Sequence, residues 1–335
     1  MFFTKQITIP LLLTTSLFSP FLCASDEKLE LADKAIQSKN YDAANRIYQN
    51  LLNEEEFQLQ ALLGQTKIAF YTNKLDAAEA LINRALEKSP NPDIFFWAGR
   101  VAGAQAKEAN IFSQLSYARS AKNYFIQALE LNPEHEDSIV GLIRFHQQAP
   151  SLAGGEKEDI PQLIKKLRKV NAVTAFDFEA PRLLQAGKTN ELHELFKKTL
   201  IAPDTKNREQ FKYDYAMSLS NYGHYSDALD ILLTIDDTNN PSLSFNNMRL
   251  YQLGKLSAEA NRELNIGLKS VVRYQALPNA EKTIPSDWVD FRIAQIKFLR
   301  SNENKAELIT IKTTTKDESL QNKINSFLER VEGTI

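Results

Sequence analysis

The sequence predicts an all-α fold, a right-handed α-solenoid of tandem helix-turn-helix repeats. Two segments carry one pattern 34 residues apart, as their matched residues show: Tyr41, Ala44, Tyr48 and Leu51, then Leu75, Ala78, Ile82 and Ala85. A period of about 34 residues is typical of stacked helix pairs. After the first 25 residues, no segment of any length shows the apolar–polar alternation of a strand. Apolar residues recur instead at the three- and four-residue steps of amphipathic helices.

Residues 1–25 predict a secretory signal peptide and therefore a periplasmic protein. Lys5 is their only charge, and an apolar run is followed by Ala24 and Ser25, small residues that suit cleavage. A membrane anchor is the alternative, but the run is short and rich in threonine. Lipidation of Cys23 is disfavoured because bacterial lipoprotein signals place a small residue before the cysteine, where this chain has Leu22. Cleavage would remove the only cysteine, which excludes thiol nucleophiles and thiolate metal ligands.

Length and composition fit an elongated folded protein. A chain of 335 residues is longer than one core usually supports, so we expect two domains or one array. The hydrophobic content of 43% and charged content of 24% are ordinary. The net charge of −2 lacks the basic excess of nucleic-acid binders, so nucleic acid is not an expected partner.

Turn residues and prolines mark where the expected helices end. Residues that tolerate a left-handed backbone stand between paired helices, namely Asn40, Asn73, Gly187, Gly223 and Gly254. Prolines follow the second helix of an expected pair and begin the next unit, at Pro90, Pro133 and Pro203. These signals divide the chain into short helix pairs.

Second helices repeat a spacing of a small or apolar residue, a large one four positions on, and another small or apolar one three further on. The copies are Ala44-Tyr48-Leu51, Ala78-Ile82-Ala85, Ala121-Phe125-Ala128, Leu192-Phe196-Thr199 and Ala228-Leu232-Ile235, with a weak last copy at Ala306. This pattern resembles the tetratricopeptide repeat (TPR), in which small residues let paired helices pack closely around a large one. The resemblance covers nearly all of residues 27–315.

Three departures from the even period add a narrower resemblance. Ala78 and Ala121 lie 43 residues apart, so we expect an insertion of nine residues between two helices, near 106–117. A second insertion is expected near 149–157, where residues 149–155 read APSLAGG, and residues 250–255 read LYQLGK. These segments resemble a subgroup of secreted bacterial TPR proteins without an assigned activity. The resemblance implies fold and compartment and says nothing of mechanism.

The predicted organisation has three parts. Residues 1–25 form the signal, residues 26–316 form an array of about seven helix pairs, and residues 317–335 form a C-terminal capping helix and tail. Residues 310–315, with the sequence TIKTTT, make a poor helix, so the boundary there is open. Asp317 is the expected N-cap of the last helix.

No motif predicts catalysis, a cofactor or a metal. The histidines, His135, His146, His193 and His224, show no metal-ligand spacing. Gly187-Lys188-Thr189 lacks the first glycine of a phosphate loop, and no serine stands in a nucleophile elbow. The basic stretch 164–170 is expected to place solvated lysines between the apolar residues of a buried stripe, with an anionic partner as the alternative. Gly154 and Gly155 suit either a ligand contact or a sharp turn, and the turn is favoured.

The expected function is a non-catalytic protein-interaction scaffold of the bacterial cell envelope, with another protein or peptide as partner and no membrane span in the mature chain. First helices line the inner groove of such stacks, and aromatic residues and arginines there dominate binding energies. An extended peptide or helix would lie against the groove candidates Lys67, Tyr71, Trp97, Arg100, Arg144, Gln148, Tyr213, Met217 and Tyr251. The alternative is a non-protein envelope ligand, such as a peptidoglycan fragment or glycan. An enzymatic function is supported in the sequence only by the loop at Gly154-Gly155.

Overall fold

The computed structural model describes residues 20–236, 242–301 and 305–332, so residues 1–19 of the expected signal lie outside it. Among the described residues every long element is a helix and no strand occurs, which confirms the predicted all-α class. No described helix is both long enough and apolar enough to cross a membrane. The chain divides into two compact units, residues 1–170 and 171–335.

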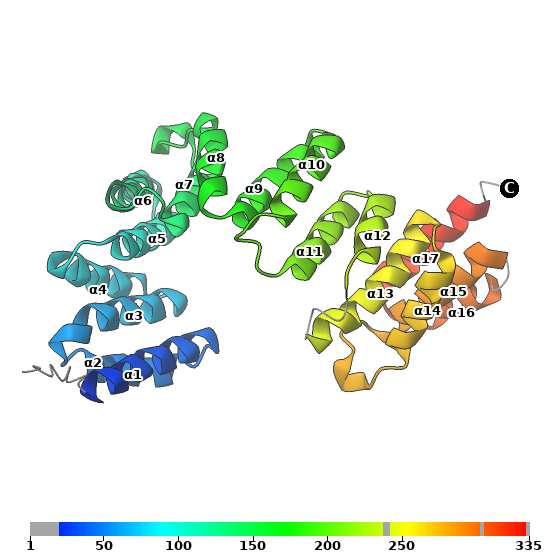
Figure 1. Ribbon diagram of the computed structural model, residues 1–335, viewed down its shortest axis with the longest axis horizontal. Coiled ribbons are helices and arrows are strands. Elements are labelled where there is room, and N and C mark those ends of the chain that lie inside the picture. The colour runs from blue at the N-terminus through cyan, green and yellow to red at the C-terminus, as the bar shows by residue number, and fades with distance from the viewer. Residues whose placement is uncertain (1–19, 237–241, 302–304, 333–335) are drawn as a thin grey trace, which may run out of the picture. The chain divides into compact units, whose positions relative to one another are not determined.

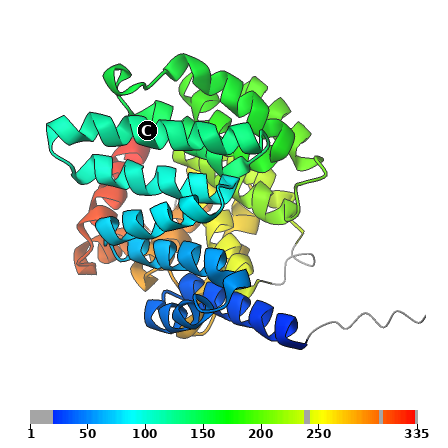
Figure 2. The same ribbon diagram turned by 90° about the vertical axis from the view of Figure 1, so that its left-hand side faces the viewer.

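Unit 1 contains eight described α-helices that follow one another in chain order (Figures 1 and 2). They are α1 (Pro20–Gln37), α2 (Tyr41–Leu51), α3 (Gln58–Tyr71), α4 (Leu75–Lys88), α5 (Pro92–Glu108), α6 (Ile111–Leu131), α7 (Glu136–Gln148) and α8 (Ile160–Val170). Short 3-10 turns lie at η1 (Glu55–Phe57), η2 (Ser151–Ala153) and η3 (Lys157–Asp159).

Unit 2 by itself contains nine described helices, which also follow one another in chain order (Figure 1). They are α9 (Ala172–Gln185), α10 (Thr189–Leu200), α11 (Arg208–Asn221), α12 (Tyr225–Leu233), α13 (Leu243–Ala260), α14 (Leu264–Gln275), α15 (Ser286–Ser301), α16 (Lys305–Thr314) and α17 (Glu318–Glu332), with a 3-10 turn at η5 (Asn279–Glu281). Taken in pairs, the described helices make eight hairpins and a last single helix, where the sequence suggested about seven.

The repeated spacing of the second helices marks the core. In all five copies, on α2, α4, α6, α10 and α12 with Ile235 just beyond it, the three patterned residues are buried. Small residues at these sites bring helices together, and the large residue between them fills the space. The stacked helix-hairpin fold is therefore TPR-like, as predicted.

Glycines on the first helix of a pair leave space for the large residue of the repeated pattern. A Cβ atom at Gly64 of α3 would lie 2.3 Å from the ring of Tyr48. The ring of Phe125 on α6 sits between two helices, because a Cβ at Gly99 of α5 or at Gly141 of α7 would come within 2.6 or 2.8 Å of it. These contacts are closer than any residue with a side chain would allow.

Two expectations about turns are wrong. The nine extra residues near 106–117 do not form an insertion between helices: α5 runs to Glu108 and α6 begins at Ile111, so the extra length extends both helices. Gly254 is not a turn residue but lies inside α13, where a Cβ would meet Val271 of α14 at 2.7 Å. Its role is to let two helices approach, which a sequence pattern does not distinguish from a turn.

The C-terminal elements also differ from the pattern in places. Ala306, the centre of the weak last copy, is exposed, and Leu308 is the buried residue of α16. The threonine-rich segment is helical to Thr314, and its hydroxyls bond back within the helix, as Thr314 does to the Thr310 carbonyl at 2.9 Å. Asp317 accepts the Leu320 N–H at 3.1 Å before α17 begins.

Candidate functional site

Four of the groove candidates meet in unit 1, where α3 and α5 contact each other. The guanidinium carbon of Arg100 lies 4.2 Å from the ring centroid of Trp97 and 4.5 Å from that of Phe70. The ammonium of Lys67 lies 5.7 Å from the Trp97 centroid. We call this group the Arg100 cluster: Lys67, Phe70, Tyr71, Phe96, Trp97 and Arg100.

Helix geometry explains why these side chains meet. Residues three and four apart share one face of a helix, which groups Lys67 with Phe70 and Tyr71 on α3 and sets Phe96 or Trp97 near Arg100 on α5. Trp97 is buried and fixes the inner end of the cluster. Tyr71 is 44% exposed and forms the outer end, where its ring stacks on that of Tyr41 at 6.2 Å.

The positive charges of the cluster are not paired with a carboxylate among the described residues. Within that part of the chain, the side chains of Lys67 and Arg100 form no ion pair and donate no hydrogen bond. Arg100 is held through its flat face by aromatic rings, an interaction of about 0.5–2 kcal/mol depending on desolvation. Its N–H groups are therefore positioned and still able to bind an acceptor.

The remaining groove candidates do not join the cluster. Arg144 and Gln148 are exposed on α7, and no hydrogen bond, ion pair or ring contact links them to it within the described residues. In unit 2, Tyr213 and Met217 are half-buried and pack against the core around Phe211. Burial, followed by the charge of Asp214, raises the pKa of Tyr213 to about 12.

Tyr251 lies in the interior of unit 2. Its side chain is buried, and its ring lies 5.6 Å from that of Tyr274 on α14. Packing between helices accounts for this residue, as it does for Tyr213, so neither offers a partner much surface. The accessible part of the predicted groove set is in unit 1.

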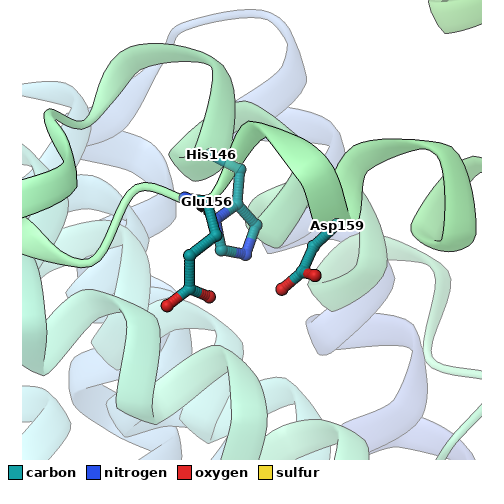
Figure 3. Close-up of side chains that lie close together, drawn as sticks. All are labelled: His146, Glu156 and Asp159. Carbon is teal, nitrogen blue, oxygen red and sulfur yellow. Dashed lines mark hydrogen bonds between the residues drawn. The ribbon is translucent and has the colours of Figure 1, made fainter.

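A second group of side chains gathers at the loop between α7 and α8 (Figure 3). His146, Glu156 and Asp159 each present one possible metal-ligand atom, and these atoms lie within 4.8 Å of one another. His146 is buried, whereas both acidic residues are exposed. This group leaves no signal in the sequence, because ten residues separate His146 from Glu156 and only the folded loop brings them together.

Hydrogen bonding argues against a metal ion in this group. The Glu156 N–H donates to Nδ1 of His146 at 2.8 Å, so the proton of the neutral ring is on Nε2. A metal-ligating histidine uses a lone pair on one nitrogen and normally donates from the other. Here Nδ1 accepts and Nε2 bears the proton. The Glu156 carboxylate is also held by the Lys122 ammonium at 2.8 Å.

The same contacts show that the group anchors the loop. Lys122 and Arg119 on α6 donate to the carbonyls of Gly154 and Leu152, at 3.1 and 3.2 Å. Burial, together with Lys122, lowers the pKa of His146, against the opposite effect of the neighbouring carboxylates. Gly154 has a φ of 90°, and a Cβ at Gly155 would meet the Ala149 carbonyl. The glycines thus serve the turn, the interpretation that the sequence favoured.

Comparisons with known proteins bear on the fold alone. No family model and no curated protein matches the sequence. A thermophilic TPR protein of Thermus thermophilus is 16% identical, with 58% of this chain and 99% of that chain covered and a TM-score of 0.46. A tetratricopeptide repeat protein from Parabacteroides merdae is 15% identical, with 82% and 99% covered and a TM-score of 0.40.

A third similar structure is the APC/C hetero-tetramer Cut9–Hcn1, 11% identical over 93% of this chain and 64% of that chain, with a TM-score of 0.37. All three TM-scores are low. The TPR-like assignment therefore stands on the helix hairpins of this chain and on the buried pattern of its second helices.

Proposed function

We propose that this protein is a non-catalytic scaffold that holds an extended, acidic segment of another protein against the Arg100 cluster. The observation that supports it is the Arg100 guanidinium, stacked on Trp97 and Phe70 and without a carboxylate partner among the described residues. A stacked arginine with free N–H groups matches a carboxylate of a partner. A stack of helix hairpins supplies surface for such a partner and implies no chemistry of its own.

The composition of the cluster also suits a protein partner. Tryptophan, tyrosine and arginine are the residues that contribute most to protein interfaces. Tyr71 and Tyr41 add an accessible aromatic surface beside the two cations. Because Arg100 and Trp97 are already ordered by packing, binding would immobilise few side chains, which lowers the entropic cost of association.

The proposal includes the cell envelope as the place of action. Its support is the sequence of residues 1–25, with one lysine, an apolar run and small residues before Asp26. Cell fractionation and N-terminal sequencing of the natural protein test this part separately. A protein that retains residues 1–25 and stays in the cytoplasm would overturn the envelope location and leave the peptide site to its own test.

A binding assay tests the peptide site. The probe is a fluorescein-labelled synthetic peptide of alternating glutamate and tyrosine, followed by fluorescence anisotropy with the full chain. Arg100→Gln removes charge-assisted hydrogen bonds of about 1.5–3 kcal/mol, so we expect about tenfold weaker binding or more. Lys107→Gln is the matched control, because this substitution also removes one positive charge and Lys107 lies exposed on the same helix outside the cluster. Equal affinities for both variants would contradict the proposal.

Crosslinking in cells identifies the natural partner and separates the two candidate ligand classes. A photoreactive phenylalanine analogue replaces Tyr71, which is exposed, and in a control replaces Phe112, which is 90% exposed on α6. We expect discrete protein adducts at Tyr71 only, reduced by Arg100→Gln. Adducts that disappear after muralytic digestion would favour the glycan or peptidoglycan alternative instead.

A further inference from the structure

Unit 2 contains a buried ion pair that joins three helices. Arg292 on α15 donates from one terminal nitrogen to Oε1 of Glu259 on α13 at 2.7 Å, and both side chains are 3% exposed. The ammonium of Lys323 on α17 lies 2.9 Å from the same oxygen. We call this group, together with two further residues described next, the Glu259 cluster: Lys255, Glu259, Arg292, Gln295 and Lys323.

The Glu259 cluster has more positive than negative charge. Lys255 lies one turn before Glu259 on α13, and its side chain forms no ion pair or hydrogen bond within the described residues. Burial, followed by the charge of Arg292, lowers the pKa of Lys255, and Glu259 is the one carboxylate among the described residues that opposes this. Three cations thus lie near one carboxylate, and two of them contact it. Two positive charges stay uncompensated in a partly buried place, which is unfavourable.

The cluster is also short of hydrogen-bond acceptors, even with the Tyr251 hydroxyl beside Arg292. Oε1 of Gln295 accepts from Arg292 at 2.7 Å, so the amide nitrogen of Gln295 is the free end. This nitrogen and Nε of Arg292 are buried donors without a partner, and both residues are almost fully buried. A buried donor without an acceptor costs about 1–3 kcal/mol. An anion with several oxygen atoms would supply both the missing negative charge and the missing hydrogen-bond acceptors.

We propose that the Glu259 cluster binds a phosphate group. A phosphate monoester carries a charge of about −1.5 to −2 near neutral pH, which matches the uncompensated charge, whereas a single carboxylate would neutralise half of it. Arg292 and Lys323 contact the same Glu259 oxygen, so these two cations lie close enough together for one compact dianion to face both. The repulsion from Glu259 is outweighed by the three cations around it.

The lysines are the part of the cluster that solvent reaches. The Lys323 side chain is 36% exposed and Lys255 is half-buried, whereas Arg292 and Gln295 are buried. The arginine is fixed there, because its guanidinium carbon lies 4.9 Å from the ring centroid of Phe291. A phosphate would reach the lysines first and the fixed arginine next. This site is separate from the Arg100 cluster, so its failure would not affect the proposed peptide site.

Calorimetric titration of the full chain with inorganic phosphate tests the proposal, with sodium chloride at the same ionic strength as the reference. Lys255→Gln and Lys323→Gln each remove one charged donor, and we expect phosphate affinity to fall about tenfold or more in each. Lys297→Gln is the matched control: Lys297 lies on α15, is 40% exposed and faces Glu307 at 3.5 Å. We expect wild-type affinity for this control.

Thermal unfolding supplies the second measurement. Phosphate binding to the folded chain raises the melting temperature. Without phosphate, Lys255→Gln is expected to melt at or above the wild-type temperature, because it removes an uncompensated charge. Phosphate that stabilises no more than chloride, or a response unchanged in both lysine variants, overturns the proposal.

Vesicle sedimentation distinguishes two sources of the phosphate group. Binding to vesicles containing phosphatidic acid, absent with phosphatidylcholine alone and lost in Lys323→Gln, assigns a lipid headgroup. Inorganic phosphate binding without vesicle binding assigns a free phosphate compound. Both outcomes support the site, and vesicle binding that is unchanged in Lys255→Gln and Lys323→Gln contradicts it.

Discussion

Replacement of Gly64 by alanine tests how closely α2 and α3 pack. The new Cβ would lie 2.3 Å from Cζ of Tyr48 and 2.5 Å from each Cε atom. The ring has little freedom to withdraw, because Tyr48 is buried and its hydroxyl donates to Asp33 at 2.7 Å. Gly64→Ala therefore forces the two helices apart or breaks that hydrogen bond.

The magnitude follows from these contacts. A Cβ contact is ordinary from 3.4 Å, so the ring must retreat by about 1.1 Å. Overpacking of a core costs about 1–3 kcal/mol, and loss of the Tyr48 hydrogen bond about 1 kcal/mol. Alanine is better than glycine in a helix by about 1 kcal/mol. The expected net loss of unfolding free energy is about 1–3 kcal/mol.

Urea unfolding followed by circular dichroism measures the effect, with Gly103→Ala as the control. Gly103 lies inside α5, but its Cβ would meet only Ala121 at 3.9 Å, so the helix propensity gain of up to about 1 kcal/mol should remain. The two substitutions should shift the midpoint in opposite directions. Equal shifts, or stabilisation by Gly64→Ala, would refute the packing argument.

Three further predictions concern buried charge and pH. Ala78→Arg should lower the melting temperature substantially, because it puts a charge at a fully buried site, whereas Ala77→Arg on the exposed side should not. Glu259→Gln leaves its buried arginine partner uncompensated and should cost about 3–5 kcal/mol in urea unfolding without phosphate. The pKa of His146 is lowered from 6.5, so the loop should be fully stable above that pH and lose stability as pH falls towards the folded pKa. Hydrogen exchange at the Glu156 amide measures this, and His146→Asn, which keeps an acceptor near Nδ1, should abolish the pH dependence.

Patterns within one hairpin could be predicted from the sequence, because a buried small residue leaves a regular trace every three or four positions. The burial of Ala44, Tyr48 and Leu51 is an example. The sequence does not reveal the role of Gly254, because a glycine that lets another helix approach and a glycine that ends its own helix look alike. The location of the extra residues near 106–117 is not predictable either, because a change in period does not show whether helices or turns have lengthened.

The sites were less predictable than the fold for a physical reason. The sequence predicts Lys67, Trp97 and Arg100 as one group because the repeat aligns α3 with α5. The sequence does not predict the Glu259 cluster, since this cluster depends on the contact of α17 with α13, where the repeat pattern has already faded. The contact between His146 and Glu156 depends on the path of an irregular loop, which no sequence periodicity describes.

The position of Phe125 has a consequence for how unit 1 melts. Its ring packs against Gly99 of α5 and against Gly141 of α7, so one side chain holds two neighbouring hairpins together. If either hairpin separates from the other, the ring is exposed and its packing against the other hairpin is lost. Loosening that begins on either side should therefore spread across α5, α6 and α7 in one cooperative step, and this stretch should be stiffer than hairpins joined by separate contacts.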